Sequence, residues 1–563
     1  MEGVEQRMVS SGMITGIDPD PAEPDGRVHQ RFPILPAEMA ARLSAHGSVE
    51  RVPAGTMLFE RGQRSVDFFL VVEGRIDMFD VDLHHRPDIF ITLTHNQFTG
   101  ETDLFSDRQV LVSARAGIDS QLLRIRHADF RHMVAGEPDI GEIIMRAFIL
   151  RRVGLVEHVH GSVILIGSGH AGNTLRLQRF LTRNVYPHRL LDIDLDPGAG
   201  GLVDCLRISA DQLPVVVGAG KDVLRNPSNA MLADALGLTE LLDPGVIYDV
   251  AVVGAGPAGL AAAVYAASEG LRTIVIESLA PGGQAGTSSK IENYLGFPTG
   301  ISGQALAGRA QVQALKFGAR LAISRAVIGL DCAQQPYGLI LEDGQTLRTR
   351  SVVIASGARY RTLDIPDYAR YEGQGIHYAA TAMEAHLCDG EEVAVVGGGN
   401  SAGQAAVFLS RTVAHVHIII RGAGLGATMS DYLVQRIETS PRITVHCFTE
   451  ITGLDGDAFL RQVTWKRHDT GISTTKPVAN LFVMIGAEPN TGWLKDCLAL
   501  DPKGFIRTGT SAEGLPLASP YATTREGIYA VGDVRSGSVK RVASGVGEGS
   551  VVVQAIHQFL NPF

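Results

Sequence analysis

From residue 248 onward, short apolar runs alternate with longer stretches in which apolar residues recur at helical spacing. The runs at 248–253, 273–276, 393–396 and 416–420 are rich in Val and Ile, which is typical of parallel strands covered on both faces. Each run is followed by enough chain for a helix that crosses back over the sheet. This alternation predicts a doubly wound α/β fold for the C-terminal part of the chain.

The N-terminal part has shorter apolar runs, with glycines at 55, 62 and 74 in the gaps between them. We predict strands over 56–59, 68–72, 76–79, 89–94 and 121–124, preceded by a helix over 36–45. A second helix is expected over 141–156, with a break at the basic pair Arg151 and Arg152. Short strands joined by glycine turns favour a small β-roll over residues 31–155.

Residues 160–240 are predicted to form a small α/β unit, with strands at 163–166, 190–193 and 215–217 and helices at 174–181 and 230–236. Residues 1–30 carry little apolar pattern and are expected to be a flexible tail. The sequence Asp243-Pro244-Gly245 is the predicted linker to the doubly wound part. That part is expected to comprise one domain from 248–365 and 486–563, and an inserted domain at 366–485.

The composition and net charge of the chain exclude some classes of binding partner. The chain has 563 residues and a net charge of −10, and no basic stripe is visible, so neither a nucleic acid nor an anionic membrane surface is expected. No apolar run reaches the roughly 18 to 20 residues of a membrane span, and the polar N-terminus is unlike a signal peptide. The five cysteines show no Cys-x-x-Cys spacing, so we expect no metal site, reduced thiols and a cytoplasmic location.

Two glycine-rich turns follow predicted strands. Gly254-Ala255-Gly256-Pro257-Ala258-Gly259 comes after 248–253, and Gly397-Gly398-Gly399-Asn400-Ser401-Ala402 comes after 393–396. Glycine lets the backbone approach a pyrophosphate, and the start of the next helix attracts its negative charge. Two such turns predict two dinucleotide sites, one for a flavin and one for a nicotinamide. Glu277, at the end of the second strand, is placed to bind a ribose.

Further motifs follow in order: Gly282-Gly283-Gln284, Glu292-Asn293-Tyr294, Gly357 after the run at 354–356, and Gly532-Asp533-Val534. With the two glycine turns, this set resembles the low-molecular-weight thioredoxin reductase family across about 248–563. The resemblance implies FAD in the outer domain, NADPH or NADH in the inserted domain, and a symmetric homodimer. It also implies that Arg541-Val542-Ala543 begins a helix near the flavin ring, where the helix N-terminus can stabilise the reduced flavin.

The predicted cofactor residues form two groups. For FAD they are Gly254, Gly256, Pro257, Ala258, Gly259, Glu277, Gly283, Gln284, Asn293, Gly357, Gly532, Asp533, Arg541, Val542 and Ala543. For the nicotinamide nucleotide they are Gly397, Gly399, Asn400, Ser401, Ala402 and Arg421. Arg421 is a single arginine where NADPH-dependent members of the family carry several, and no carboxylate there favours NADH, so NADPH is the expected donor.

The cysteine pair of that family is missing. Ala379 and Ala382 occupy its two positions, and Cys388 lies too close to the second glycine turn to replace either one. No catalytic protein residue is therefore predicted. We expect electrons to leave the flavin for an external acceptor, which could be a disulfide protein, a ferredoxin or flavodoxin, a quinone or oxygen. Two alternatives stay open: disulfide reduction through partner thiols or Cys388, and a non-catalytic flavin or nucleotide sensor.

Residues 31–155 resemble the cyclic-nucleotide-binding β-roll in Val52-Pro53-Ala54-Gly55, Glu60-Arg61-Gly62 and Val72-Glu73-Gly74. The phosphate cassette of that family has Gly-Glu, followed by an arginine ten positions after the glycine. Here Gly100-Glu101 is present, but Val110 stands at the arginine position and Arg108 is displaced by two. A valine offers no cation to a cyclic phosphate, so docking or dimerisation competes with cyclic-nucleotide binding as the role of this domain.

Residues 160–240 allow two interpretations. Gly167-Ser168-Gly169-His170-Ala171-Gly172 is a third G-x-G-x-x-G, with Asp192 and Asp194 about 20 residues further on, as in a dinucleotide site. Leu213-Pro214-Val215-Val216 instead resembles the proline that precedes an inner strand of thioredoxin-like proteins, often in the cis form. The unit is short for a full nucleotide-binding fold, so we favour a thioredoxin-like module without its Cys-x-x-Cys.

Overall fold

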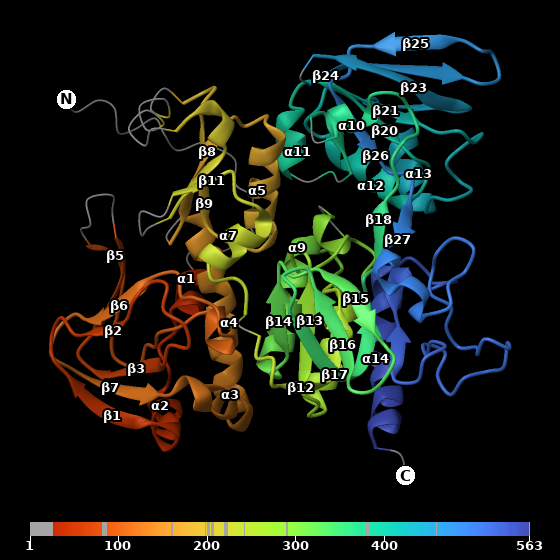
Figure 1. The fold of residues 1–563 in the computed structure, drawn as a ribbon. Coiled ribbons are helices and arrows are strands. Elements are labelled where there is room, and N and C mark those ends of the chain that lie inside the picture. The colour runs from red at the N-terminus through yellow and green to blue at the C-terminus, as the bar shows by residue number, and fades with distance from the viewer. Residues whose placement is uncertain are drawn as a thin grey trace, which may run out of the picture. The chain divides into compact units, whose positions relative to one another are not determined.

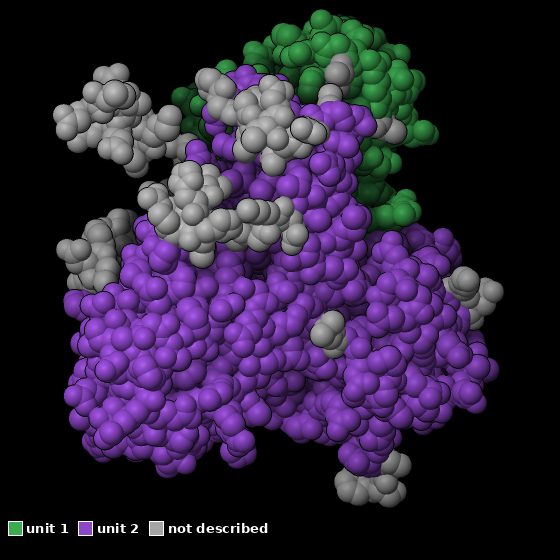
Figure 2. Space-filling model, turned by 60° about the vertical axis from the view of Figure 1, so that its left-hand side comes forward, with its two compact units in different colours: residues 1–19, 287–305, 359–488 green, residues 20–286, 306–358, 489–563 purple. Residues whose placement is uncertain are grey.

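The computed structural model describes residues 26–81, 87–158, 161–196, 199, 203, 208–218, 223–240, 242–288, 291–372, 374–378, 380, 382–457 and 459–561 (Figure 1). These residues divide into two compact units (Figure 2). Unit 1 contains residues 287–305 and 359–488. Unit 2 contains the described residues from 26 to 286, those from 306 to 358 and those from 489 onward.

The N-terminal part of unit 2 is a β-roll made of two antiparallel sheets, in the strand orders β1-β7-β3 and β2-β6-β4-β5. Five phenylalanines that are distant in sequence pack in its core, among them Phe68, Phe98 and Phe148. The predicted β-roll is confirmed. Its strands are β1 (Ser48–Val52), β2 (Met57–Phe59), β3 (Phe68–Glu73), β4 (Ile76–Val81), β5 (Pro87–Leu93), β6 (Ser113–Ala116) and β7 (Ser120–Ile125).

In the described part of the chain, the α-helices that accompany the β-roll are α1 (Gly26–Arg31), α2 (Ala37–Leu43), α3 (His127–Gly136) and α4 (Pro138–Glu157). The last residues of the expected tail, 26–30, belong to α1, whereas residues 1–25 lie outside the described residues. One prediction was wrong here: α4 continues through the basic pair at which we predicted a break. The helix continues because both charges are compensated inside the protein: Arg151 stacks on the ring of Phe98, and Arg152 pairs with acidic side chains of the β-roll.

The next segment of unit 2 is an α/β unit with a four-stranded sheet in the order β11-β10-β8-β9. Strands β8 and β9 are parallel, and the other neighbours are antiparallel. The peptide bond between Leu213 and Pro214 is cis. This mixed sheet differs from the parallel sheet of a dinucleotide-binding fold, and the thioredoxin-like module stays a prediction. The elements are β8 (Val163–Gly167), α5 (Gly172–Arg183), β9 (His188–Asp192), β10 (Val215–Val217), β11 (Val223–Arg225) and α7 (Asn229–Ala235).

The C-terminal part of unit 2, called the FAD lobe below for the cofactor that its motifs imply, is built on a seven-stranded sheet. Its order is β14-β13-β12-β17-β16-β15, with β28 pairing with β17. The pairs of β12 with β13 and β17, of β13 with β14 and of β17 with β28 are parallel, as predicted. The strands are β12 (Ile247–Val253), β13 (Thr273–Glu277), β14 (Arg320–Ile323), β15 (Val327–Asp331), β16 (Tyr337–Leu341), β17 (Thr346–Ile354) and β28 (Ile528–Ala530).

Helices α8 (Pro257–Ser268) and α14 (Val542–Leu560) pack closely in the FAD lobe, because α14 carries glycines where it meets α8. A Cβ added at Gly549 would lie 2.2 Å from the carbonyl oxygen of Ala258. The lobe also contains a disulfide between Cys332 and Cys497, which are 165 positions apart. This pair contradicts the expectation of reduced thiols, which rested on the absence of Cys-x-x-Cys spacing and could not detect cysteines joined only by the fold.

Unit 1, called the nicotinamide lobe below, has a parallel sheet in the order β19-β26-β20-β21-β22 and an antiparallel sheet of β23, β24 and β25. The parallel strands are β19 (Ile376–His377), β20 (Glu392–Val396), β21 (His415–Ile419), β22 (Ile443–His446) and β26 (Asn480–Val483). The antiparallel strands are β23 (Thr449–Gly456), β24 (Leu460–Arg467) and β25 (Ser473–Lys476). The helices are α10 (Tyr368–Tyr371), α11 (Ala382–Leu387), α12 (Asn400–Leu409) and α13 (Asp431–Glu438).

Candidate dinucleotide sites

The first glycine turn connects β12 to α8 in a geometry that only glycine allows. Gly254 has φ +104°, and a Cβ there would lie 2.4 Å from the carbonyl oxygen of Ala355. A Cβ at Gly259 would lie 1.9 Å from the carbonyl oxygen of Gly254. Gly256 is the N-cap of α8 and Pro257 its first residue, and no side chain of the described residues caps this helix. Its N-terminal N–H groups are thus available for a phosphate.

The loop after β13 folds over this turn. The Glu277 carboxylate accepts hydrogen bonds from the backbone amides of Ala255, at 2.8 Å, and Leu279, at 2.9 Å. The amide of Gly282 donates to the carbonyl oxygen of Ala255 at 2.7 Å. Gly283, at φ +52°, faces the backbone of Gly256, so that a Cβ there would lie 3.0 Å from the Gly256 Cα. The structure therefore brings together residues that the sequence placed in separate motifs.

The end of the chain returns to the same place. Gly532 and Asp533 lie in the 3-10 helix η6 (Gly532–Val534), where a Cβ at Gly532 would lie 2.9 Å from the Ala258 Cβ. Burial raises the pKa of Asp533 above its ordinary range, although Lys540 opposes the shift. Arg541 is the N-cap of α14, and Val542 and Ala543 open that helix.

Other predicted FAD residues are placed differently. Gln284 donates a hydrogen bond to the carbonyl oxygen of Ala358. Gly357 has φ +63°, and its carbonyl oxygen accepts a hydrogen bond from the backbone amide of Asn490 at 3.0 Å. Asn293 is exposed in the segment 287–305 of unit 1, so it is the one predicted FAD residue outside unit 2.

These residues fit a flavin dinucleotide. Glycine backbone lines the turn where a side chain would collide, a helix N-terminus is left uncapped by side chains, and a carboxylate anchors the strand end beside it. Sequence reasoning missed Glu548 of α14, whose carboxylate accepts a 2.6 Å hydrogen bond from the Gly532 amide and pairs with Arg535. The sequence feature that could have identified Glu548 is that it is a lone carboxylate within a run rich in Gly, Ser and Val.

The second glycine turn connects β20 to α12 in the nicotinamide lobe. Gly397 has φ +139°, and a Cβ there would lie 2.3 Å from the carbonyl oxygen of Met484. Gly399 is the N-cap of α12. The Asn400 side chain accepts a 2.7 Å hydrogen bond from the Ser430 amide, which fixes the loop after β21 against the turn.

The remaining predicted residues of this site have different surroundings. Ser401 is exposed on the first turn of α12, whereas Ala402 is fully buried in the core of the lobe. Arg421 is exposed just after the end of β21. The turn therefore fits a second dinucleotide, with Arg421 as the cation at the neighbouring strand end.

The structure describes only one of the two positions at which the family carries its cysteine pair. Ala382 is the first residue of α11, whereas Ala379 lies outside the described residues. Cys388 is fully buried, and burial together with the charges of Glu391 and Glu384 strongly raises the pKa of its thiol. The thiolate is the reactive form of cysteine, so burial disfavours the form in which Cys388 could act in place of the missing pair.

The described residues contain neither a metal-binding cluster nor a membrane-spanning helix. Within the described residues, no cluster of three or more His, Cys, Asp or Glu side chains could hold a metal ion. Across the same parts of the chain, no helix combines the length and the apolar character needed to cross a bilayer.

Comparison with known proteins agrees with this geometry. Residues 248–549 match the family described as pyridine nucleotide-disulphide oxidoreductase, and residues 49–137 match the cyclic nucleotide-binding domain. A thioredoxin reductase of Treponema pallidum is 34% identical over 56% of this chain and 97% of its own length. The Lactococcus lactis thioredoxin reductase structure (FR conformation) covers 56% of this chain and 99% of its own, with 30% identity and a TM-score of 0.51.

Another relative is matched over a smaller share of its own length. The NADPH-dependent thioredoxin reductase 3 of Arabidopsis thaliana is 31% identical over 61% of this chain, and the match spans 65% of that relative's length. The resemblances that the glycine motifs and the β-roll motifs indicated are confirmed at the level of the family.

Proposed function

The chain belongs to the pyridine nucleotide-disulphide oxidoreductase family, and from this membership we propose that it is an FAD-dependent oxidoreductase that takes hydride from NADPH and passes electrons to an external acceptor. One observation supports both parts of the proposal. The two glycine turns are intact, yet alanine stands at the cysteine positions and Cys388 is buried.

The protein would bind and orient two dinucleotides, while the flavin supplies the hydride and electron chemistry. Glu277 and the turn at 254–259 would hold the adenosine and pyrophosphate of FAD, and Asp533 would approach from the end of the chain. In the nicotinamide lobe the uncapped start of α12 would hold the second pyrophosphate. Arg421 would bind the 2′-phosphate that distinguishes NADPH from NADH.

A disulfide protein is the first acceptor to test, because the relatives with the same two lobes are named thioredoxin reductases. Without a dithiol beside the flavin, such an acceptor would have to supply its own thiols. A ferredoxin or flavodoxin, a quinone and oxygen complete the set of acceptors. A symmetric homodimer belongs to the proposal through the family resemblance. A cytoplasmic location stays part of the proposal on the ground of the cysteine spacing in the sequence.

An anaerobic titration with NADPH, followed by the visible absorbance of the flavin, tests the proposal. We expect bleaching to be complete at one NADPH per FAD, with no uptake of a second equivalent. Matched titrations of the Cys332→Ser/Cys497→Ser variant should give the same end point. If the wild type takes up a second equivalent of NADPH and this variant does not, the disulfide of the FAD lobe is an internal acceptor. A flavin that neither NADPH nor NADH bleaches would overturn the proposal and favour a sensor.

A further inference from the structure

The nucleotide cassette of the β-roll is filled by side chains of the protein itself. Glu101 and Asp103 are 8% and 5% exposed, and both pair with Arg152 of α4, at 2.7 Å and 2.5 Å. The Nε of Arg152 also donates to the Thr102 hydroxyl at 3.3 Å. The carboxylate that would bind the ribose of a cyclic nucleotide is therefore already held by an arginine from the following helix.

Among the described residues of the cassette, the arginine nearest to the phosphate position, Arg108, is buried, and its Nη2 has no hydrogen-bond partner. Val110, at the arginine position, is 8% exposed and belongs to the core of the β-roll. Arg108 is equally buried, and burial lowers the pKa of its guanidinium although the charges of Asp103, Glu240 and Glu101 act in the opposite direction. Its positive charge thus faces carboxylates that are already in place.

The outer side of the cassette is covered by the α/β unit. Leu111 and Val112 share one apolar cluster with Tyr186 and Leu238 of that unit. The amide of Gln109 donates to the carbonyl oxygen of Gly237 at 3.4 Å. These contacts hold the segment at 109–112 against the α/β unit.

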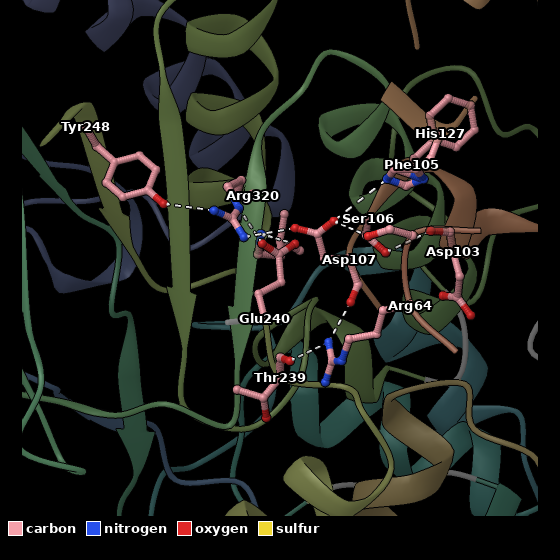
Figure 3. A network of polar contacts seen from close by, with 12 residues as sticks. Arg64, Asp103, Phe105, Ser106, Asp107, His127, Thr239, Glu240, Tyr248 and Arg320 are labelled. Carbon is pink, nitrogen blue, oxygen red and sulfur yellow. Dashed lines mark hydrogen bonds and ion pairs between the residues drawn. The ribbon is translucent and has the colours of Figure 1, made fainter. Parts of the chain in front are cut away.

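The same segment reaches the FAD lobe through a chain of ion pairs (Figure 3). Asp107 pairs with Arg320 at 3.2 Å, and Arg320 pairs with Glu240 at 2.6 Å. Glu240 is only 3% exposed at its side chain and also accepts a hydrogen bond from the Leu321 amide. Arg64 of the β-roll donates to the carbonyl oxygens of Asp107 and Thr239. Three parts of unit 2 therefore meet at the first residue of β14.

A second contact lies on the loop that closes over the first glycine turn. At the end of α5, Arg183 donates to the carbonyl oxygen of Gly283 at 2.8 Å, and Asn184 donates to that of Leu279 at 3.2 Å. Strand β14 pairs with β13, which ends at Glu277. Both contacts thus act on the strand and loop that hold the predicted adenosine side of the FAD site.

We propose that the degenerate cassette of the β-roll is a docking surface for the chain's own FAD lobe and that, with the α/β unit, it clamps the β13–β14 side of the lobe and slows the loss of FAD. This inference rests on the proposed function only in its assumption that FAD is bound. It replaces a cyclic-nucleotide site with an internal interface, and it gives the two N-terminal domains a role in holding the cofactor.

The Arg320→Gln variant tests the clamp, because it leaves Glu240 buried without its cation. We expect FAD to leave this variant at least about tenfold faster than the wild type, measured by the recovery of flavin fluorescence after dilution. Arg350→Gln is the matched control, because it removes an exposed pair with Asp249, at 3.2 Å in the same lobe. Asp107→Asn is a milder change at a half-exposed residue and should speed release to a smaller extent.

Two further measurements separate the possible failures. Hydrogen exchange at β14 in the FAD-free protein should rise in Arg320→Gln and not in Arg350→Gln, and it reports the clamp even if the protein proves not to bind FAD. Equilibrium binding with cyclic AMP and cyclic GMP should show no saturable site in the wild-type chain. Saturable binding of either nucleotide, or release of FAD from Arg320→Gln and Asp107→Asn at the rate of Arg350→Gln, would overturn the inference.

Discussion

The carboxylate of Glu277 lies 2.8 Å from the backbone amide of Ala255 and accepts its hydrogen. This contact joins the end of β13 to the glycine turn after β12, two points 22 residues apart in the chain. The other carboxylate oxygen accepts the amide of Leu279. Glu277 therefore shapes the turn and its covering loop from within, in addition to any bond that it makes to a ribose.

The Glu277→Gln variant should bind FAD at least about tenfold more weakly than the wild type. An amide side chain has one acceptor oxygen, so one of the two backbone amides loses its partner, and hydrogen bonds to a charged group contribute about 1.5 to 3 kcal/mol. Reconstitution of the FAD-free protein, followed by quenching of flavin fluorescence, measures the affinity. Glu269→Gln serves as the control, because it alters an exposed carboxylate just after α8 that pairs with His557. Equal affinity in Glu277→Gln and the wild type would contradict this role.

Two glycines of the same lobe should respond in opposite ways to alanine. At Gly259 the new methyl would lie 1.9 Å from the carbonyl oxygen of Gly254, so the turn must open and FAD binding should be lost. At Gly308, within α9 (Gly303–Lys316), a Cβ meets nothing within 4 Å, and alanine should stabilise the protein by about 0.5 to 1 kcal/mol. Thermal unfolding and the flavin content of the purified variants measure both effects. A yellow, stable Gly259→Ala protein would exclude the assigned turn.

The glycine turns and buried strands could be predicted because their signals are local. Runs rich in Val and Ile that are followed by glycines predict β12, β20 and the helix after each of them. Strand β6 (Ser113–Ala116) and helix α3 were not predicted, since the first has small and polar residues and the second weak apolar periodicity. Their positions depend on packing against the rest of the β-roll.

Long-range pairs could not be predicted at all. Glu240 and Arg320 are separated by 80 positions, and Cys332 and Cys497 by 165. In each pair the two residues carry no mutual pattern in the sequence, because only the folding of distant segments of the chain onto one another brings them together. The departures at Val110, Ala379 and Ala382 could be recognised from the sequence, but the partners that fill the cassette, such as Arg152, required the structure.

Arg421 should determine the choice between NADPH and NADH. It is exposed directly after β21, beside the second glycine turn, and an arginine can bind a phosphate with two parallel hydrogen bonds. Arg421→Ala should raise the KM for NADPH about tenfold, a loss of ~1.4 kcal/mol, and leave the KM for NADH nearly unchanged. Steady-state flavin reduction with each donor measures this difference. Arg461→Ala, an exposed arginine of β24, is the control, and equal losses with both donors would contradict the assignment.

Acidification should destabilise the nicotinamide lobe through a pair of histidines. His417 is 5% exposed and lies 3.1 Å from His446 between ring nitrogens, and its other nitrogen contacts Glu392 at 2.9 Å. Burial is the main cause that lowers both pKa values, and His446 falls from 6.5 to about 4. The folded lobe therefore binds fewer protons than the unfolded chain below pH 6.5.

Above pH 6.5, His446 should not reduce the free energy of unfolding. As the pH falls from 6.5 toward 4, that free energy should decrease by up to about 1.4 kcal/mol per pH unit for each such group. The fluorescence of Trp465 reports this unfolding, since its ring lies 5.4 Å from both histidine rings. Replacing Trp493, the second tryptophan, with Phe leaves Trp465 as the only indole. In that background His446→Asn should flatten the pH profile, whereas His468→Gln, at an exposed position of the same lobe, should not change it. An unchanged profile in His446→Asn would show that other groups carry the acid sensitivity.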